Sequence, residues 1–327
     1  MTGTAHEIRI TRHGGPEVLE WVEVDPGEPA AGEARVRFDA VGLNFIDIYH
    51  RTGLYPVPLP SGLGMEAAGV VTAVGPAVTD LAVGDRVACA TGTVGTYTTE
   101  RVVPVRHLAP LPEGVDAETA AASMLAGLTA RYLLLDTFPV APGQTILFHA
   151  AAGGVGLIAC QWAKALGARV IGTVSTEAKA EIARAHGCDL ALIHGKDDIV
   201  ARVRAETDGL GVPVVYDSVG KDTFDTSLDC LAPRGLMVSF GNASGAVPPF
   251  SPGILAQKGS LYLTRPTLMH YVPTREALVA ASADLFGAIA QGRIRITIGQ
   301  RFALKDAALA HEALASRRTT GATVLLP

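Results

Sequence analysis

The chain has 327 residues, of which 48% are hydrophobic and 18% charged, and its formal net charge is −5 at pH 7. This length predicts two domains with sizeable cores, and the acidic balance argues against nucleic-acid binding as the main function. No signal pattern and no apolar stretch of about 18 residues is visible, so no membrane insertion is expected. The four cysteines are widely separated and form no CxxC pair, which favours a cytoplasmic location.

The first third of the chain is rich in short strand-like segments and turns. Glu7–Ile10, Leu19–Val24, Ala34–Val41 and Glu66–Val74 have the alternating or β-branched character of strands, whereas Asn44–Arg51 predicts a short helix. Strands at this density, with no long helices between them, predict a small barrel-like β domain.

The composition changes at Asp116–Thr137. This stretch is rich in Ala and Leu at helical spacing, which predicts one helix linking two domains. Strands and helices then alternate regularly, which predicts a parallel sheet with helices on both faces. Ser260–Thr264 is expected at the edge of that sheet. Thr274 is expected to cap a helix that runs to about Gln291. The closing strand, Thr323–Leu326, is expected to return to the first domain.

The most informative stretch is Gln144–Thr176. An apolar strand, Thr145–Phe148, leads into a glycine-rich turn, and a helix and a second strand, Arg169–Val174, follow. In this order the glycines predict a dinucleotide site, because they allow a tight turn and a close approach of the backbone to a pyrophosphate, whose charge the helix N-terminus stabilises. The residues assigned to this turn are Gly153, Gly154, Val155 and Gly156.

Four motifs carry a resemblance to a known family: Asn44–Asp47 (NFID), Gly64–Gly69 (GMEAAG), Ala82–Val87 (AVGDRV) and Ala150–Gly156 (AAAGGVG). Together they resemble the medium-chain dehydrogenase/reductase superfamily. Within it, the chain is similar over essentially its whole length to the zinc-independent, zeta-crystallin-like quinone oxidoreductases and their bacterial NADPH:quinone reductases.

The resemblance implies an α/β fold with a GroES-like β domain and a doubly wound Rossmann-type parallel-sheet domain. The expected ranges are 1–125, completed by about 292–327, for the GroES-like catalytic domain and 126–291 for the NADPH-binding domain. It also implies an active-site cleft between the domains and a homodimer joined through edge strands of the Rossmann-type sheet.

No metal is expected. Zinc alcohol dehydrogenases of the same superfamily use a thiolate and an imidazole where this chain has Asn44 and Met65, and no cysteine lies between Ala90 and Leu111 to build a structural zinc lobe. Without a Lewis acid to polarise an alcohol, reduction of an electron-poor acceptor is favoured over alcohol oxidation.

The cofactor is predicted from the end of the second strand. Ser175 stands where an NAD enzyme places an acid for the ribose 2′-hydroxyl, and Thr176 and Lys179 follow, so the position favours the 2′-phosphate of NADPH. Glu177 leaves NADH open as an alternative, although an acid is favoured in the first turn of a helix that Thr176 caps.

The resemblance adds two further residues to the phosphate site. His194 stands where the family has a tyrosine, either as a pH-sensitive phosphate contact or as a surface histidine. Arg317 matches a position that approaches the cofactor, and Arg318 beside it leaves that assignment open by one residue.

Hydride transfer from nicotinamide needs a positioned ring and donors near the acceptor oxygens. Asn44, Tyr49 and Tyr55 are the polar groups expected there. Asp47 is either a ribose anchor or a helix-surface carboxylate, and Tyr132 is either a cofactor contact or a core tyrosine. The other residues that the resemblance assigns to the cofactor are Phe45, Ile46, Ser218, Phe240, Gly241, Asn242, Ala243, Pro266, Thr267 and Leu268.

These features predict an NADPH:quinone oxidoreductase with a small-molecule quinone as its partner. The alternative is an NADPH-dependent enone or enoyl reductase, which acts on an activated C=C bond and which residue chemistry alone does not separate from the first. A binding or structural protein is a third class, and the acidic balance and the intact glycine fingerprint argue against it.

Overall fold

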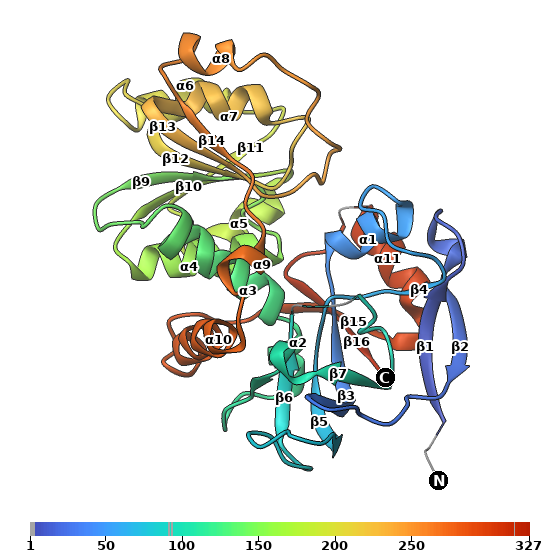
Figure 1. The fold of residues 1–327 in the computed structure, drawn as a ribbon. Helices are drawn as coiled ribbons and strands as arrows, with labels where there is room; N and C mark the ends of the chain where they lie inside the picture. Colours follow the sequence, from blue (N-terminus) through green and yellow to red (C-terminus); the bar gives the residue numbers. More distant parts are fainter. Residues whose placement is uncertain (1–3, 91, 93, 317) are drawn as a thin grey trace. The chain divides into compact units, whose positions relative to one another are not determined.

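The computed structural model describes residues 4–90, 92, 94–316 and 318–327, which form two units (Figure 1). Unit 1 comprises the described residues of Met1–Leu128 together with Val272–Gln291 and Ile296–Pro327, and unit 2 comprises Thr129–Tyr271 and Gly292–Arg295. In these described ranges, no helix is both long enough and apolar enough to cross a membrane.

Unit 1 contains a larger and a smaller β-sheet. The strands of the larger sheet are β3 (Glu33–Leu43), β5 (Glu66–Val74), β6 (Arg86–Cys89), β7 (Glu100–Pro104), β8 (Ala109–Pro110), β15 (Ile298–Ala303) and β16 (Ala322–Leu326). Their order is β15-β16-β3-β5-β6-β8, and β7 also pairs with β3. The smaller sheet has the order β2-β1-β4, from β1 (Ala5–Ile10), β2 (Glu20–Val24) and β4 (Ser61–Gly62). The pairing of β16 with β3 confirms that the last strand returns to the first domain.

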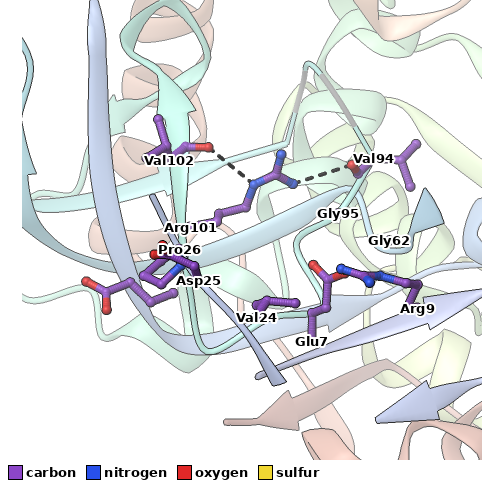
Figure 2. A pocket seen from close by; sticks show the side chains of 11 residues that line it. Glu7, Arg9, Val24, Asp25, Pro26, Gly62, Val94, Gly95, Arg101 and Val102 are labelled. Atoms are coloured by element: carbon purple, nitrogen blue, oxygen red, sulfur yellow. Dashed lines mark hydrogen bonds and ion pairs between the residues drawn. The ribbon is translucent and has the colours of Figure 1, made fainter. Parts of the chain in front are cut away.

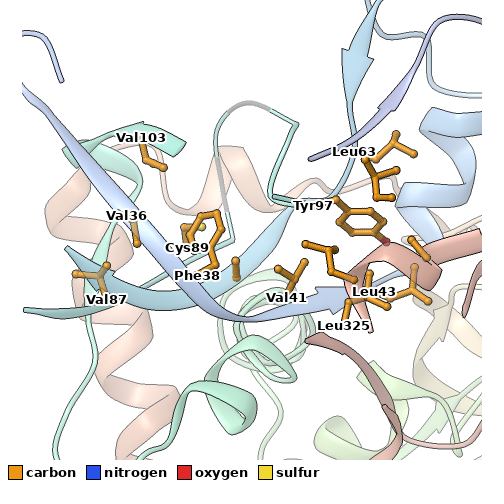
Figure 3. Packing of buried hydrophobic residues seen from close by; sticks show 14 of the residues in the cluster. Val36, Phe38, Val41, Leu43, Leu63, Val87, Cys89, Tyr97, Val103 and Leu325 are labelled. Atoms are coloured by element: carbon orange, nitrogen blue, oxygen red, sulfur yellow. The ribbon is translucent and has the colours of Figure 1, made fainter. Parts of the chain in front are cut away.

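The core of unit 1 follows from alternation along the strands. In β3, Ala34, Val36 and Phe38 are buried while Arg35 and Arg37 between them are not, as the period of two in a strand requires. Burying each large apolar side chain contributes roughly 1.5–3 kcal/mol. Figure 3 shows Val36 and Phe38 packed with side chains from neighbouring elements, including Leu63, Val87, Cys89, Tyr97 and Leu325.

The helices of unit 1 pack against these sheets. They are α1 (Phe45–Thr52), α2 (Ala117–Ala121), α10 (Arg275–Ala290) and α11 (Ala307–Ala315), with short 3-10 turns η1 (Pro16–Val18), η2 (Val105–His107) and η4 (Leu304–Asp306). Thr274 caps α10 as predicted, its hydroxyl accepting from the backbone N of Ala277 at 3.3 Å. The range expected for the second domain, 126–291, includes α10, which in the structure packs against β8 and η2 of unit 1.

The prediction of one helix over Asp116–Thr137 is wrong. The chain forms α2, then α3 (Met124–Arg131), then a π-helical segment η3 (Tyr132–Thr137). At the break, the Ser123 hydroxyl donates to the carbonyl of Thr119 at 2.7 Å. The backbone N–H of Leu125 donates to the carboxylate of Glu66 at 2.5 Å. A long-range partner that local sequence cannot reveal therefore competes with helix continuation.

Unit 2 is a parallel sheet with the order β11-β10-β9-β12-β13-β14. Its strands are β9 (Thr145–Phe148), β10 (Arg169–Val174), β11 (Leu190–Ile193), β12 (Val212–Asp217), β13 (Leu231–Ser239) and β14 (Tyr262–Thr264). Its helices are α4 (Gly154–Ala165), α5 (Glu177–Ala185), α6 (Ile199–Ala205), α7 (Phe224–Cys230), α8 (Gly253–Gln257) and α9 (Leu268–Tyr271).

The predicted arrangement of this sheet is confirmed. Helices α4 and α5 lie on one face and α6 and α7 on the other (Figure 1). Strand β14 lies at the edge of the sheet, as expected for Ser260–Thr264. Because neighbouring strands are parallel, their carboxyl ends share one edge, and ligands of open α/β sheets bind at that edge.

Candidate active site

Asn44 lies between β3 and α1, where extended backbone (φ −129°, ψ 160°) turns into the helix. The carboxylate of Asp47, in the first turn of α1, accepts from the backbone N of Asn44 at 2.8 Å. An acid at this place also suits the positive end of the helix dipole. The helix start thereby fixes the backbone of Asn44, and its half-buried side chain extends from a rigid position.

The side chain of Asn44 is held by Glu66 of β5, which is only 2% exposed. The Asn44 amide nitrogen donates to Glu66 Oε1 at 2.7 Å, and Glu66 Oε2 accepts from the backbone N of Leu125 at 2.5 Å. Burial raises the pKa of Glu66 to about 8. In this arrangement the amide nitrogen faces Glu66, which uses one of its two N–H groups.

Glu66 belongs to the Gly64–Gly69 motif, but the sequence did not predict it as a site residue. The available signal was a carboxylate in the otherwise apolar and small run Glu66–Val71, since buried carboxylates are rare unless they are hydrogen-bonded. The isolated acid was therefore visible in the sequence, but its partner Asn44 lies 22 residues away.

Asp47 belongs to a buried network that joins α1 to α11. Asp47 Oδ2 also accepts from the hydroxyl of Tyr97 at 3.0 Å. Since that proton is used, the Tyr97 oxygen accepts from His311 Nε2 at 3.1 Å, and His311 Nδ1 in turn accepts from Arg51 Nη1 at 3.0 Å. Burial raises the pKa of Asp47 to about 7, and burial, helped by Arg51, lowers the pKa of His311 to about 3.

The two predicted tyrosines lie together beside this network. The rings of Tyr49 and Tyr55 meet edge to face with their centroids 5.1 Å apart, and Phe45 lies 6.4 Å from Tyr49. The backbone N of Tyr55 donates to the carbonyl of Tyr49 at 3.1 Å. Tyr49 is buried, while Tyr55, Phe45 and Ile46 are half-buried. Unit 1 therefore brings Asn44, Asp47 and the aromatic residues into one cluster around α1.

In unit 2 the glycine turn has the geometry of a helix start. Gly153 caps α4, and its backbone N donates to the carbonyl of Ala150 at 2.9 Å. A Cβ at Gly156 would lie 2.4 Å from that carbonyl oxygen and 2.8 Å from the backbone of Ala151. Gly156 is therefore required by the turn itself, before any ligand binds. Gly154 and Val155 open the helix, whose first N–H groups suit an anion.

The predicted phosphate residues follow β10. Thr176 caps α5 as predicted, its hydroxyl accepting from the backbone N of Lys179 at 3.3 Å. Ser175 is exposed. Glu177, which left NADH open, forms ion pairs with Arg184 at 3.3 Å and with Lys196 at 3.5 Å.

His194 follows β11, and its backbone N donates to the carbonyl of Val174 at 2.9 Å, so it lies at the same sheet edge as the Ser175 turn. Its ring contacts the hydroxyl of Thr173. The candidate Arg317 lies outside the described residues, and Arg318 is exposed.

The remaining predicted residues of unit 2 lie at or near the carboxyl ends of β12, β13 and β14. The carbonyl of Ser218 accepts from the backbone N of Ala243 at 3.1 Å. A Cβ at Gly241 would lie 2.5 Å from that same carbonyl oxygen. Phe240 and Asn242 belong to the same turn, and the turn at Pro266 and Thr267 precedes Leu268, the first residue of α9.

Tyr132 is 4% exposed and stacks on Tyr271, with ring centroids 4.4 Å apart. Burial raises the pKa of its phenol well above the ordinary value. Both features fit the core-tyrosine alternative, and a cofactor role for Tyr132 stays a prediction.

The described residues contain no group of three or more His, Cys, Asp or Glu side chains that could hold a metal ion. A hollow of about 310 Å³ lies in unit 1 near β1 and β7 (Figure 2). Its charged groups are occupied locally: Arg9 pairs with Glu7 at 2.7 Å, and Arg101 donates to the carbonyl of Val94 at 3.4 Å. None of the predicted site residues lines this hollow.

A β unit of this topology, and a parallel sheet with a glycine turn after its first strand in the chain, define the medium-chain dehydrogenase/reductase class. Residues 30–113 match the alcohol dehydrogenase GroES-like domain, and residues 154–275 match the zinc-binding dehydrogenase domain. The chain is 60% identical to a quinone oxidoreductase of Pseudomonas aeruginosa, covering 99% of this chain and 100% of that protein. It is 46% identical to a 2-haloacrylate reductase of a Burkholderia species, covering 97% and 98%.

Among solved structures, the quinone oxidoreductase of Escherichia coli complexed with NADPH matches with a TM-score of 0.97 and 52% identity, covering 99% of this chain and 100% of that one. The chain therefore belongs to the quinone oxidoreductase family of the medium-chain dehydrogenases/reductases. This confirms the predicted family and fold class.

The Glu66 carboxyl makes the stability of unit 1 depend on pH. Its folded pKa of about 8 lies above the ordinary 4.5, so its stabilising contribution is full below pH 4.5 and is lost as the pH rises through about 8. We expect the unfolding free energy to fall with pH across this window by at most about 1.4 kcal/mol per pH unit from this group. Glu66→Gln should flatten that slope.

Urea unfolding of wild type and Glu66→Gln at several pH values measures the difference. Glu113→Gln, at an exposed position, is the matched control and should keep the wild-type slope. Equal slopes in Glu66→Gln and wild type would contradict the assignment.

Gly153 and Gly156 of the turn should differ in how well they tolerate substitution by alanine. Gly156→Ala places a methyl group against backbone atoms that cannot move aside and should lower the free energy of unfolding by roughly 1–3 kcal/mol. Gly153→Ala places its methyl group 3.2 Å from the Ala150 carbonyl oxygen and should cost less. Urea unfolding compares the two, and an equal or reversed order would show that the turn geometry is not the constraint.

Proposed function

We propose that this chain is an NADPH:quinone oxidoreductase that reduces a small-molecule quinone without a metal. The observation that carries the cofactor choice is the end of β10. Ser175 stands there in place of an acid, and the neighbouring Glu177 is paired with Arg184 and Lys196. Because residue 175 is a serine, there is no carboxylate at this position to repel a 2′-phosphate. The names of the relatives, and the NADPH in the Escherichia coli structure, support the same choice.

The residues of unit 2 would bind the cofactor. NADPH, when bound, supplies the hydride. Gly153, Gly154, Val155 and Gly156 would hold the pyrophosphate, and Ser175, Thr176, Lys179 and His194 the 2′-phosphate. The residues at the carboxyl ends of β12 to β14 would orient the nicotinamide half: Ser218, Phe240, Gly241, Asn242, Ala243, Pro266, Thr267 and Leu268.

The cluster around α1 would serve the acceptor. Asn44, Tyr49 and Tyr55 would hydrogen-bond the quinone oxygens as negative charge develops on them. The Asn44 amide nitrogen has two N–H groups, and Glu66 uses one of them, so the other would donate to the quinone oxygen. Phe45 and Ile46 would supply apolar contact. Asp47, buried and already bonded to Asn44 and Tyr97, would hold the helix start instead of touching the cofactor.

We further propose that unit 2 is the nucleotide-binding domain, and that the protein is a cytoplasmic homodimer joined through the free edge of β14. Tyr262 on that strand is 56% exposed, which supports an edge available for pairing. The four cysteines are free thiols, as suits a reducing compartment. A monomeric mass by sedimentation equilibrium would exclude the dimer, and cell fractionation tests the location.

Steady-state assays test the reaction. We expect turnover of 1,4-benzoquinone with NADPH at a kcat/KM about tenfold or more above that with NADH, because charge-assisted phosphate contacts favour the 2′-phosphate. An α,β-unsaturated ketone is the comparison acceptor. A higher kcat/KM for the ketone would favour the enone reductase alternative, and equal values with the two cofactors would overturn the cofactor proposal.

Ser175→Asp should reverse the cofactor preference. The new carboxylate would repel the 2′-phosphate but could accept from the ribose 2′-hydroxyl of NADH. We expect kcat/KM with NADPH to fall about tenfold or more while the value with NADH is kept or rises. Ser175→Ala is the matched control: it removes the hydroxyl without adding a charge, so it should lower the NADPH value less than Ser175→Asp does and leave the NADH value unchanged. A Ser175→Asp enzyme that still prefers NADPH would show that the phosphate binds elsewhere.

A further inference from the structure

A buried carboxylate anchors a chain of hydrogen bonds inside unit 2. Asp217, the last residue of β12, accepts at Oδ1 from the backbone N of Val219 at 2.8 Å and of Gly220 at 2.9 Å. At Oδ2 it accepts from the hydroxyls of Thr223 and Ser227, both at 2.7 Å. Asp217 is 0% exposed. These donors leave the carboxylate as a fixed acceptor at one end of the chain.

The direction of each following bond is then determined. Ser227 has one hydroxyl proton, and it goes to Asp217, so the Ser227 oxygen accepts from Nε2–H of His149 at 3.0 Å. His149, also 0% exposed, therefore has no proton on Nδ1. That nitrogen accepts from the hydroxyl of Thr173 at 2.8 Å.

The last bond reaches His194. Because the hydroxyl proton of Thr173 is used by His149, the Thr173 oxygen accepts from Nε2–H of His194 at 2.9 Å. A neutral His194 thus carries its proton on Nε2 and a lone pair on Nδ1. Its ring also stacks on His149, with centroids 5.7 Å apart and planes at 21°. The chain fixes both the tautomer and the orientation of the ring.

His194 is half-buried, whereas the other members of the chain are fully buried. It follows β11 at the sheet edge that also carries the exposed Ser175 and Thr176. The one nitrogen that these hydrogen bonds leave unused, Nδ1, therefore belongs to the one member that is not fully buried.

We propose that His194 is a proton-dependent specificity residue for the 2′-phosphate of the nucleotide, and that Ser227, His149 and Thr173 are positioning residues that present its Nδ1. The inference rests on the proposed NADPH dependence. On binding, Nδ1 takes one proton from solvent and donates it to a phosphate oxygen, while Nε2–H continues to donate to Thr173. No covalent bond forms or breaks, and the Asp217 carboxylate stabilises the new positive charge along the chain.

The charged and titratable groups around His194 support this use. Burial lowers the pKa of His194 in the protein without nucleotide, and Asp217 and Asp222 oppose that effect. Burial lowers the pKa of His149 to about 4, so His149 stays neutral. Lys196, on the same turn, is paired with Glu177. A bound phosphate raises the pKa of His194, so the added affinity is full at low pH and is lost as the pH rises through the pKa of the complex.

Isothermal titration calorimetry of NADPH and NADH, in buffers of different ionisation enthalpy, counts the protons taken up on binding. Between pH 7.0 and 8.5 the phosphate itself is largely a dianion, since its second pKa is about 6. We expect the NADPH affinity of the wild-type protein to fall about fivefold over this range with measurable proton uptake. NADH should show neither effect.

Three variants isolate the chain. His194→Gln retains a side-chain N–H for Thr173 but cannot titrate, so it should abolish both the pH dependence and the proton uptake. Ser227→Ala removes the link to Asp217 and should reduce the uptake while leaving NADH affinity unchanged. Ser282→Ala is the matched control, because Ser282 is equally buried but donates to the carbonyl of Leu278 in α10. It should behave as wild type.

NADPH binding without proton uptake in the wild type, or uptake that persists in His194→Gln, would overturn the role of His194. Ser227→Ala with the full wild-type uptake would overturn the role of the chain. Equal affinity of the wild type for NADPH and NADH at pH 7 would instead overturn the proposed cofactor preference, so the two failures are distinguishable.

Discussion

The hydrogen bond from the Leu125 backbone to the buried carboxylate of Glu66 constrains unit 1 at the place where its fold and its candidate chemistry meet. Satisfying a buried carboxylate is obligatory, since leaving it without donors costs several kcal/mol. Helical structure is interrupted there between α2 and α3, and the N-terminus of α3 faces β5. The same side chain orients Asn44, so one buried carboxyl group sets both a helix boundary and the direction of a candidate site residue.

In unit 2 a buried carboxylate also orients a candidate site residue, but through several intervening hydrogen bonds. Asp217 is anchored by two backbone N–H groups and passes its orientation through two hydroxyls and an imidazole to His194. In both units a buried carboxyl group lies at one end, and an amide or an imidazole lies at the other. Because Asp217 accepts from four donors, the bonds that follow it have one consistent direction, which removes the ambiguity that an imidazole otherwise has.

Much of the fold could be predicted from sequence because its determinants are local. The alternation in β3, the Thr176 and Thr274 caps and the glycine turn each depend on residues within a few positions of one another. The break before α3 could not be predicted, because its cause is Glu66, 59 residues from Leu125. The residue types of the site were visible, but their partners were not. Ser227 lies 78 residues from His149, and nothing near either residue in the sequence indicates the other.

The resting state of His194 explains why a histidine suits this position better than a permanent cation. A fixed positive charge beside the buried hydroxyl of Thr173 would have to be desolvated in every molecule without nucleotide, at a cost that Asp217 only partly offsets. A neutral imidazole with a defined tautomer avoids that cost and gains its charge only when an anion arrives. Discrimination by such a residue depends on the phosphate alone, because a ribose hydroxyl offers no charge to raise the pKa of the ring.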